Sequence, residues 1–151
     1  KYVAEQGEFL TNKIKNMIVE NPDIINKQKK DIIYVISPFK NVAYQLSKEL
    51  NKIEFTRYDK KGKPTNIGTV HTFQGKEAPI VFFVLGADKK CIGAANWAVG
   101  TDNPNIMNVA VTRAKEEFYI IGDKEMYLSL NSDVINDTCK IIEKHNMNTS
   151  L

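Results

Sequence analysis

The densest group of chemically capable side chains lies at residues 68–77, in the run Gly-Thr-Val-His-Thr-Phe-Gln-Gly-Lys-Glu. Hydroxyl, imidazole, amide and carboxylate groups crowd together there beside two glycines, a mixture suited to holding phosphates, sugars or bases. One alternative is capping of a short helical turn by Thr72 and Gln74, with His71 as an ordinary partly buried residue. The polar cluster as a whole favours a ligand site, and its members are Thr69, His71, Thr72, Gln74 and Glu77.

A second group is the run Asn-Val-Ala-Val-Thr-Arg-Ala-Lys at residues 108–115. We expect a helix that places Arg113 beside the small Ala110 and Ala114, on a face that packs inward. A half-buried arginine needs an anion, and the run alone leaves open whether this is a structural carboxylate or a ligand phosphate. All but two of the 21 basic residues are lysines. The other arginine, Arg57, falls in a charged loop, where we expect it to contribute little.

A third group is Ser37-Pro38-Phe39-Lys40, directly after a predicted strand. The Ser37 hydroxyl and the backbone amides are suited to a phosphate, and Phe39 is suited to stacking on a base. The alternative is an ordinary turn that ends the strand, and this segment on its own favours the turn.

The elements that position these groups alternate along the chain. Apolar periodicity predicts strands at 32–36, 67–71, 79–85 and 118–121, helices at 3–20, 41–52 and 103–115, and C-terminal helices within 124–145. A long irregular connection spans 86–103. This alternation predicts an α/β fold of three αβα layers around a mostly parallel sheet. Ligands of such sheets bind beyond the carboxyl ends of the strands, where we expect all three groups to lie.

Composition bounds the class of protein. The 151 residues fit one domain over 1–151, with its core at 31–123. A net charge of +3 neither identifies nor excludes a nucleic-acid-binding protein. Two widely spaced cysteines predict no zinc site and a reduced, cytoplasmic setting, and the longest apolar run, 80–86, is too short for a membrane span. Because the chain starts without Met, we expect a piece of a longer polypeptide.

In their order and spacing the three runs resemble motifs IV, V and VI of the second RecA-like domain of superfamily 1 helicases. The branch they resemble contains the nonsense-decay helicase and senataxin-type proteins, and the resemblance covers about 31–123. It implies a RecA-like P-loop NTPase fold that lacks its own P-loop. Many members of that branch have Asp in place of His71. The T-V-H-x-x-Q-G-x-E form is instead similar to DNA helicase subunits of the exonuclease V type, which favours DNA over RNA.

The resemblance also implies roles for individual residues. Arg113 is the expected catalytic arginine finger, which reaches the γ-phosphate of ATP bound on a partner domain. Glu77 is expected to contact the nucleotide, and Gln74 with Gly75 to link the state of the nucleotide to the strand. The residues expected to bind single-stranded nucleic acid are Ser37, Phe39, Thr69 and His71.

Half of an ATP site is absent from this sequence. No G-x-x-x-x-G-K-[ST] loop and no paired acidic Mg²⁺ motif occurs in the 151 residues. ATP with Mg²⁺ would therefore be bound mainly by an N-terminal RecA-like domain of the same protein, and we expect this chain alone not to hydrolyse ATP. The predicted function is the C-terminal motor domain of an ATP-dependent helicase, monomeric and without membrane contact. The alternatives are a non-catalytic nucleic-acid-binding or regulatory domain, or a translocase without unwinding activity.

Overall fold

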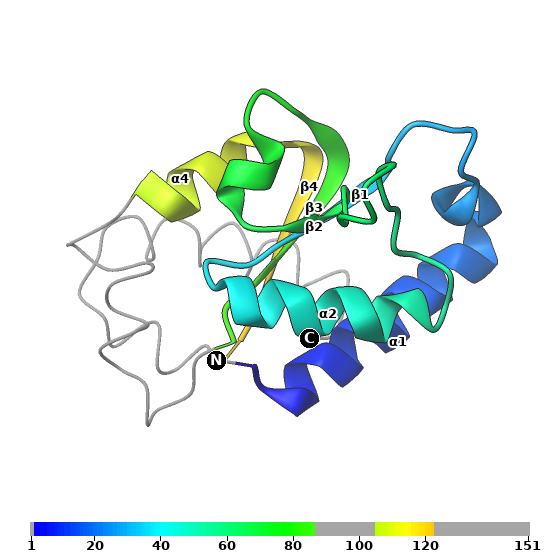
Figure 1. Cartoon of the computed structure of the whole chain (residues 1–151), viewed down its shortest axis with the longest axis horizontal. Helices are drawn as coiled ribbons and strands as arrows, with labels where there is room; N and C mark the ends of the chain where they lie inside the picture. Colours follow the sequence, from blue (N-terminus) through cyan, green and yellow to red (C-terminus); the bar gives the residue numbers. More distant parts are fainter. Residues whose placement is uncertain (1, 87–104, 123–151) are drawn as a thin grey trace.

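A computed structural model describes residues 2–86 and 105–122, which contain a four-stranded parallel sheet (Figure 1). Its strand order is β2-β1-β3-β4. In the central strands, Ile36 pairs with Gly68 on one side and with Phe83 on the other. The strands are β1 (Ile33–Ile36), β2 (Ile67–Gly68), β3 (Ala78–Val84) and β4 (Ala114–Ile121).

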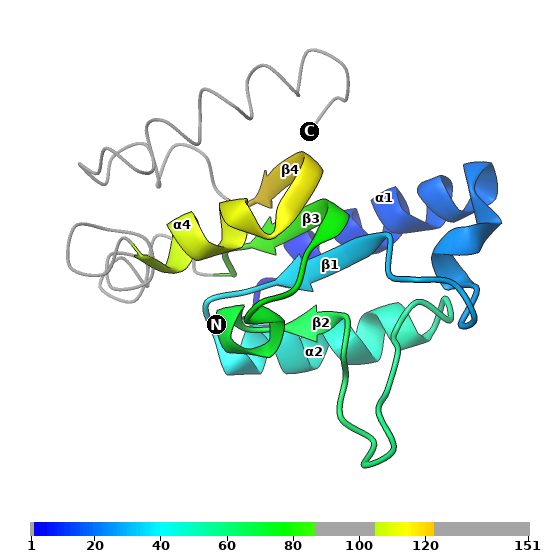
Figure 2. The same cartoon turned by 90° about the horizontal axis from the view of Figure 1, so that it is seen from above.

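Helices cover both faces of the sheet and complete the three predicted layers (Figures 1 and 2). On one face, α1 (Ala4–Glu20) and α2 (Lys40–Asn51) pack on alternate strand residues such as Val35 and Phe82. The other face carries Ile36 and Phe83 beneath the short helix η2 (Val70–Phe73) and α4 (Asn105–Thr112). A further short helix, η1 (Pro22–Ile25), follows α1. The predicted α/β class is therefore confirmed.

Two strand predictions were wrong at their boundaries. The strand expected at 67–71 ends at Gly68, because the next N–H of the neighbouring chain that would face β2, that of Phe39, donates to Ser37 Oγ instead of to a strand carbonyl. Residues 70–73 form η2 instead. The last strand begins at Ala114, four residues before the predicted 118, because pairing with Ala78 extends it. The preceding helix therefore stops at Thr112.

Arg57 holds two segments of the chain together, so the prediction that it contributes little was wrong. Its Nε lies 3.2 Å from Asp31 Oδ1, as an ion pair rather than a well-angled hydrogen bond. Its other nitrogens donate to the carbonyls of Lys29 at 2.6 Å and Asn26 at 2.8 Å. Since Asn66 Oδ1 accepts from the backbone N–H of Arg57, the same residue also anchors the loop that follows.

That loop is a small hairpin, which Figure 2 shows projecting away from the sheet beside α2. Tyr58 and Pro64 form an antiparallel bridge, and Asp59 N–H donates to the Lys63 carbonyl at 2.9 Å. Gly62 turns the chain with a φ of 81°. The hairpin, residues 58–64, matches the predicted solvated loop because most of it is exposed.

Several predictions fall on residues that the structure does not describe. They are most of the 86–103 connection, including Trp97, and the C-terminal helices within 124–145. Within the described residues, no helix is both long enough and apolar enough to cross a membrane.

Candidate functional site

The candidate residues lie at two opposite ends of the sheet. Ser37 and Thr69 follow β1 and β2 at the carboxyl edge. Glu77 and Arg113 directly precede β3 and β4 at the amino edge, beside each other because Ala78 pairs with Ala114. The prediction that all three groups lie at carboxyl ends was therefore wrong for Glu77 and for the run at 108–115.

The separation of the two edges follows from the register. Gly68 lies level with Phe83, because both pair with Ile36. Ala78 stands five residues before Phe83 on β3, so roughly 16 Å of strand separates the edges at about 3.3 Å per residue. The chain covers this distance between Gly68 and Ala78 by η2 and one turn. We call this segment, residues 69–77, the connector.

A tight turn at the amino edge presents the motif V side chains. The Lys76 N–H donates to the Phe73 carbonyl at 2.9 Å, and Gln74 has φ −57° and ψ 122°. Gly75 follows with φ 74°, as the third residue of a type II turn requires. Gln74 and Glu77 are exposed, and within the described parts of the chain their side chains make no hydrogen bond or ion pair.

Arg113, directly after the end of α4, donates hydrogen bonds to this turn. Its Nη1 donates to the carbonyl of Phe73 at 3.3 Å and to that of Lys76 at 3.4 Å, and Nη2 donates to the Thr112 hydroxyl at 3.4 Å. Arg113 itself lies in the turn between α4 and β4, so its expected place on a helical face with Ala114 was wrong. These bonds bring Arg113 next to the turn that carries Gln74, Gly75 and Glu77.

The guanidinium of Arg113 is incompletely satisfied. Its three hydrogen bonds are longer than the usual 2.9–3.0 Å, and its Nε is buried without a partner. The ion pairs of residues 2–86 and 105–122 are Lys52–Glu49 and Arg57–Asp31, so no described carboxylate neutralises it.

At the carboxyl edge, Ser37 is fully buried and forms part of a turn. Its N–H donates to the Gly68 carbonyl at 3.0 Å, and its Oγ accepts from the Phe39 N–H at 3.2 Å. These bonds match the alternative of a strand-ending turn. Phe39 is half-buried and packs against the cores on both faces of the sheet, at the start of α2.

The polar side chains of η2 are available for binding. Thr69 precedes the helix but its side chain makes no capping bond. His71 is exposed, and neither it nor Thr72 makes a side-chain hydrogen bond within the described ranges. The capping alternative is therefore unsupported here. Glycine at position 68 allows the Thr72 side chain to pack directly against the backbone, because a Cβ at this position would overlap that side chain.

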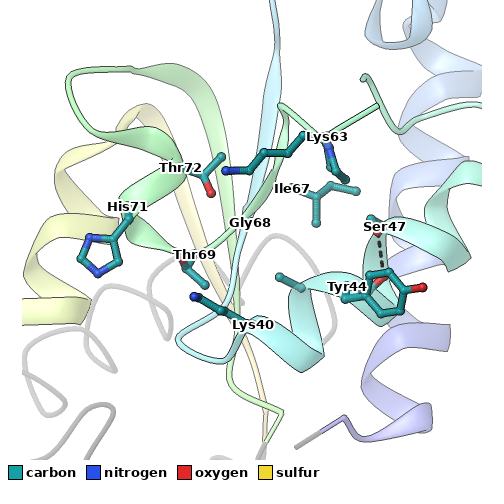
Figure 3. Close-up of a pocket in the computed structure, with 11 residues that line it drawn as sticks. Lys40, Tyr44, Ser47, Lys63, Ile67, Gly68, Thr69, His71 and Thr72 are labelled. Atoms are coloured by element: carbon teal, nitrogen blue, oxygen red, sulfur yellow. Dashed lines mark hydrogen bonds between the residues drawn. The ribbon is translucent and has the colours of Figure 1, made fainter. Parts of the chain in front are cut away.

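Beside η2 lies a pocket of about 550 Å³, bounded by α2, β2 and the hairpin (Figure 3). It contains Thr69, His71 and Thr72, but also side chains that motif reasoning missed. These are Tyr44 on α2 and Lys63 on the hairpin. The sequence contained a signal for Tyr44, because Lys40, Tyr44 and Lys48 are spaced four residues apart and so lie along one side of the predicted helix.

Comparison with known proteins places the chain in a family. Residues 4–125 match the AAA domain family. Over 127 residues, or 82% of this chain, it is 31% identical to the helicase sen1 of Schizosaccharomyces pombe, and it spans 7% of that relative's length. These matches agree with the parallel sheet and with the motifs resembling IV, V and VI. The chain therefore belongs to the AAA domain family, as a sen1-like domain of the superfamily 1 helicases.

Proposed function

We propose that this chain is the C-terminal motor domain of an ATP-dependent helicase. In this proposal it completes an ATP site shared with an N-terminal RecA-like domain and supplies contacts to single-stranded nucleic acid. The observation that carries the proposal is the incompletely satisfied guanidinium of Arg113, clasped to the turn that presents Gln74 and Glu77. A purely nucleic-acid-binding domain would not need this arrangement at the end of the sheet away from the strand contacts.

At the amino edge, the proposed role of Arg113 is to stabilise negative charge on the phosphoryl group as it leaves. Its forked donors lie with one buried nitrogen unpartnered, and an approaching phosphate would replace the long bonds to carbonyls with charge-assisted ones. Glu77 is suited to accept a hydrogen bond from a ribose hydroxyl. Gln74 and Gly75 connect this edge to η2.

Mg²⁺ would be held by the proposed N-terminal domain. Within the described residues, no cluster of three His, Cys, Asp or Glu side chains could hold a metal ion. Mg²⁺ supplies neutralisation of phosphate charge when ATP is bound. In this proposal the described residues contribute an arginine and nucleotide contacts.

At the carboxyl edge, Thr69 and His71 are proposed to bind phosphates or bases of one strand, with DNA favoured over RNA because of His71. Support comes from their exposed or half-buried side chains, which make no hydrogen bond among the described residues. Phe39 is half-buried, and in this proposal its ring stacks on a base. The Ser37 hydroxyl is buried, so we propose that Ser37 acts through the turn that it stabilises.

The test is ATP turnover by the full-length protein with Arg113→Ala. We expect kcat to fall by about 1,000-fold, the lower end of the range for arginine fingers, with the affinity for ATP much less affected. The 151-residue chain alone should show no turnover. Unchanged kcat in the variant, or strand-stimulated hydrolysis by the chain alone, would contradict the shared-site proposal.

A further inference from the structure

We propose that the bound strand continues from Thr69 and His71 into the pocket between α2 and the hairpin. There Lys40 and Lys63 each bind a backbone phosphate, and Tyr44 stacks on a base. This inference rests on the proposed function and extends the strand path to residues outside the motifs.

The charge of the pocket favours a polyanion. Its lining contains Lys40, Lys63 and His71 but no Asp or Glu. Neither lysine pairs with a carboxylate in the described part of the chain, so both ammonium groups remain free for an external anion. Figure 3 shows them extending from opposite walls, Lys40 toward Thr69 and Lys63 toward Thr72. Two cations beside two hydroxyls provide the donors that successive phosphates accept.

Tyr44 provides a stacking surface at the same site. It is 57% exposed, although large aromatic side chains are usually covered. The Ser47 hydroxyl donates to its carbonyl at 2.7 Å, and Lys48 Nζ lies 4.8 Å from its ring centroid. An exposed ring accompanied by lysines is the combination by which proteins bind single strands without sequence preference.

The remaining walls match the apolar parts of a nucleotide. Ala43, Pro64 and Ile67 line the pocket between the polar groups. The volume, about 550 Å³, lies within the range of sites for small ligands. A free nucleotide shares this chemistry with one unit of a strand. Continuity with Thr69 and His71, whose side chains make no hydrogen bond among the described residues, favours the strand.

The decisive measurement is the salt dependence of binding. The full-length protein is titrated against a fluorescent oligothymidylate at several salt concentrations, without ATP. Removal of one phosphate-binding lysine should lower the slope of log K against log salt by about 0.7 for a single strand. Lys40→Gln with Lys63→Gln should therefore lower it by about 1.4. The control Lys15→Gln with Lys30→Gln removes the same charge from exposed positions outside the pocket and should leave the slope unchanged.

The stacking role has its own matched pair. Tyr44→Ala should weaken oligothymidylate binding by about tenfold, whereas Tyr44→Phe should retain it because the ring remains. Thermal melting of each variant confirms that it is folded. Equal slopes for the pocket and control lysine variants, or equal affinities for the two Tyr44 variants, would overturn the proposal.

Two further measurements distinguish failure of this inference from failure of the proposed function. Thr69→Val with His71→Ala tests the strand site of the proposed function. If this variant binds weakly while the pocket variants bind normally, the extension is wrong and the proposed strand site stands. If all variants bind normally, both proposals fail. If the pocket variants no longer bind ADP or inorganic phosphate but keep the oligonucleotide, the pocket is a nucleotide or phosphate site and the inference is overturned.

Discussion

The surroundings of the two arginines differ sharply. Arg57 has a carboxylate partner, with Asp31 Oδ1 3.2 Å from its Nε as an ion pair without a well-angled hydrogen bond, and its other nitrogens donate to carbonyls at 2.6 and 2.8 Å. The hydrogen bonds of Arg113 are 3.3–3.4 Å long, and its Nε is buried without a hydrogen-bond partner. No carboxylate of the described residues forms an ion pair with Arg113. The same residue type thus stabilises the fold at one place and remains available at the other. The lack of a paired carboxylate among the described residues and the long hydrogen bonds, rather than residue type, distinguish the functional candidate.

The strongest test of this contrast exchanges each arginine for lysine. Arg113→Lys should lower kcat for ATP by at least about 100-fold in the full-length protein, because lysine has no forked donor, and change the free energy of unfolding by less than about 0.5 kcal/mol. Arg57→Lys should do the reverse, lowering the free energy of unfolding by about 2 kcal/mol because the bonds to Lys29 and Asn26 are removed. Turnover assays and urea unfolding measure the two effects. If both variants lose mainly stability, the contrast fails.

Gly75 tests whether the turn under Arg113 must keep its shape. Gly75→Ala places a side chain on a backbone with φ 74°, at a position where no atom lies within 4 Å of the new Cβ. The expected cost to folding is therefore conformational, about 1 kcal/mol. Displacement of Gln74 and Glu77 should lower ATP turnover by about tenfold or more, with oligonucleotide affinity unchanged. Normal turnover in a folded variant would argue against a positioned turn.

The smallest expected effect is a change with pH in the free energy of unfolding, caused by Asp31, the ion-pair partner of Arg57. Burial raises the pKa of this carboxyl above 3.8, although the charges of Arg57, Lys76 and Lys27 act in the opposite direction. The folded state then holds the proton more tightly than the unfolded state does. This stabilisation is complete below about pH 3.8 and is lost as the pH rises through the raised pKa.

Asp31→Asn removes this titration, since the amide stays neutral and can still accept from Arg57. The free energy of unfolding of the wild-type chain should fall relative to that of the variant over a window that begins near pH 3.8 and extends through the raised pKa. Urea unfolding at several pH values measures the difference. A constant difference across this window, or one that moves the opposite way, contradicts the raised pKa.

Periodicity predicted most of the fold because the spacing of apolar residues reflects how the buried elements pack. The apolar run of β1 and the four-residue spacing of Val42, Leu46 and Leu50 in α2 correspond to buried faces. The ends of β2 and β4 were not predicted, because they depend on which backbone N–H and C=O groups of the neighbouring strand are available for pairing. The turn after β1, in which the Phe39 N–H donates to Ser37 Oγ, shortens β2, and pairing with Ala78 lengthens β4.

The candidate site was predictable in its members but not in its arrangement. Motif V and motif VI named the residues that the structure brings together around Gly75 and Arg113. Their location at the amino edge followed from the helix ending at Thr112, which local periodicity did not reveal. The partners of Arg57 and the position of Lys63 in the wall of the pocket depend on tertiary contacts. No spacing along the chain encodes them.

The connector between Gly68 and Ala78 limits how the length of this chain can vary. It spans roughly 16 Å of sheet with η2, one type II turn and few further residues, so an added or deleted residue would shift one edge relative to the other. The exposed tip of the hairpin, at Lys60 to Gly62, carries no such constraint. Among relatives of this domain, insertions should therefore collect at the hairpin tip, and residues 69–77 should keep a constant length.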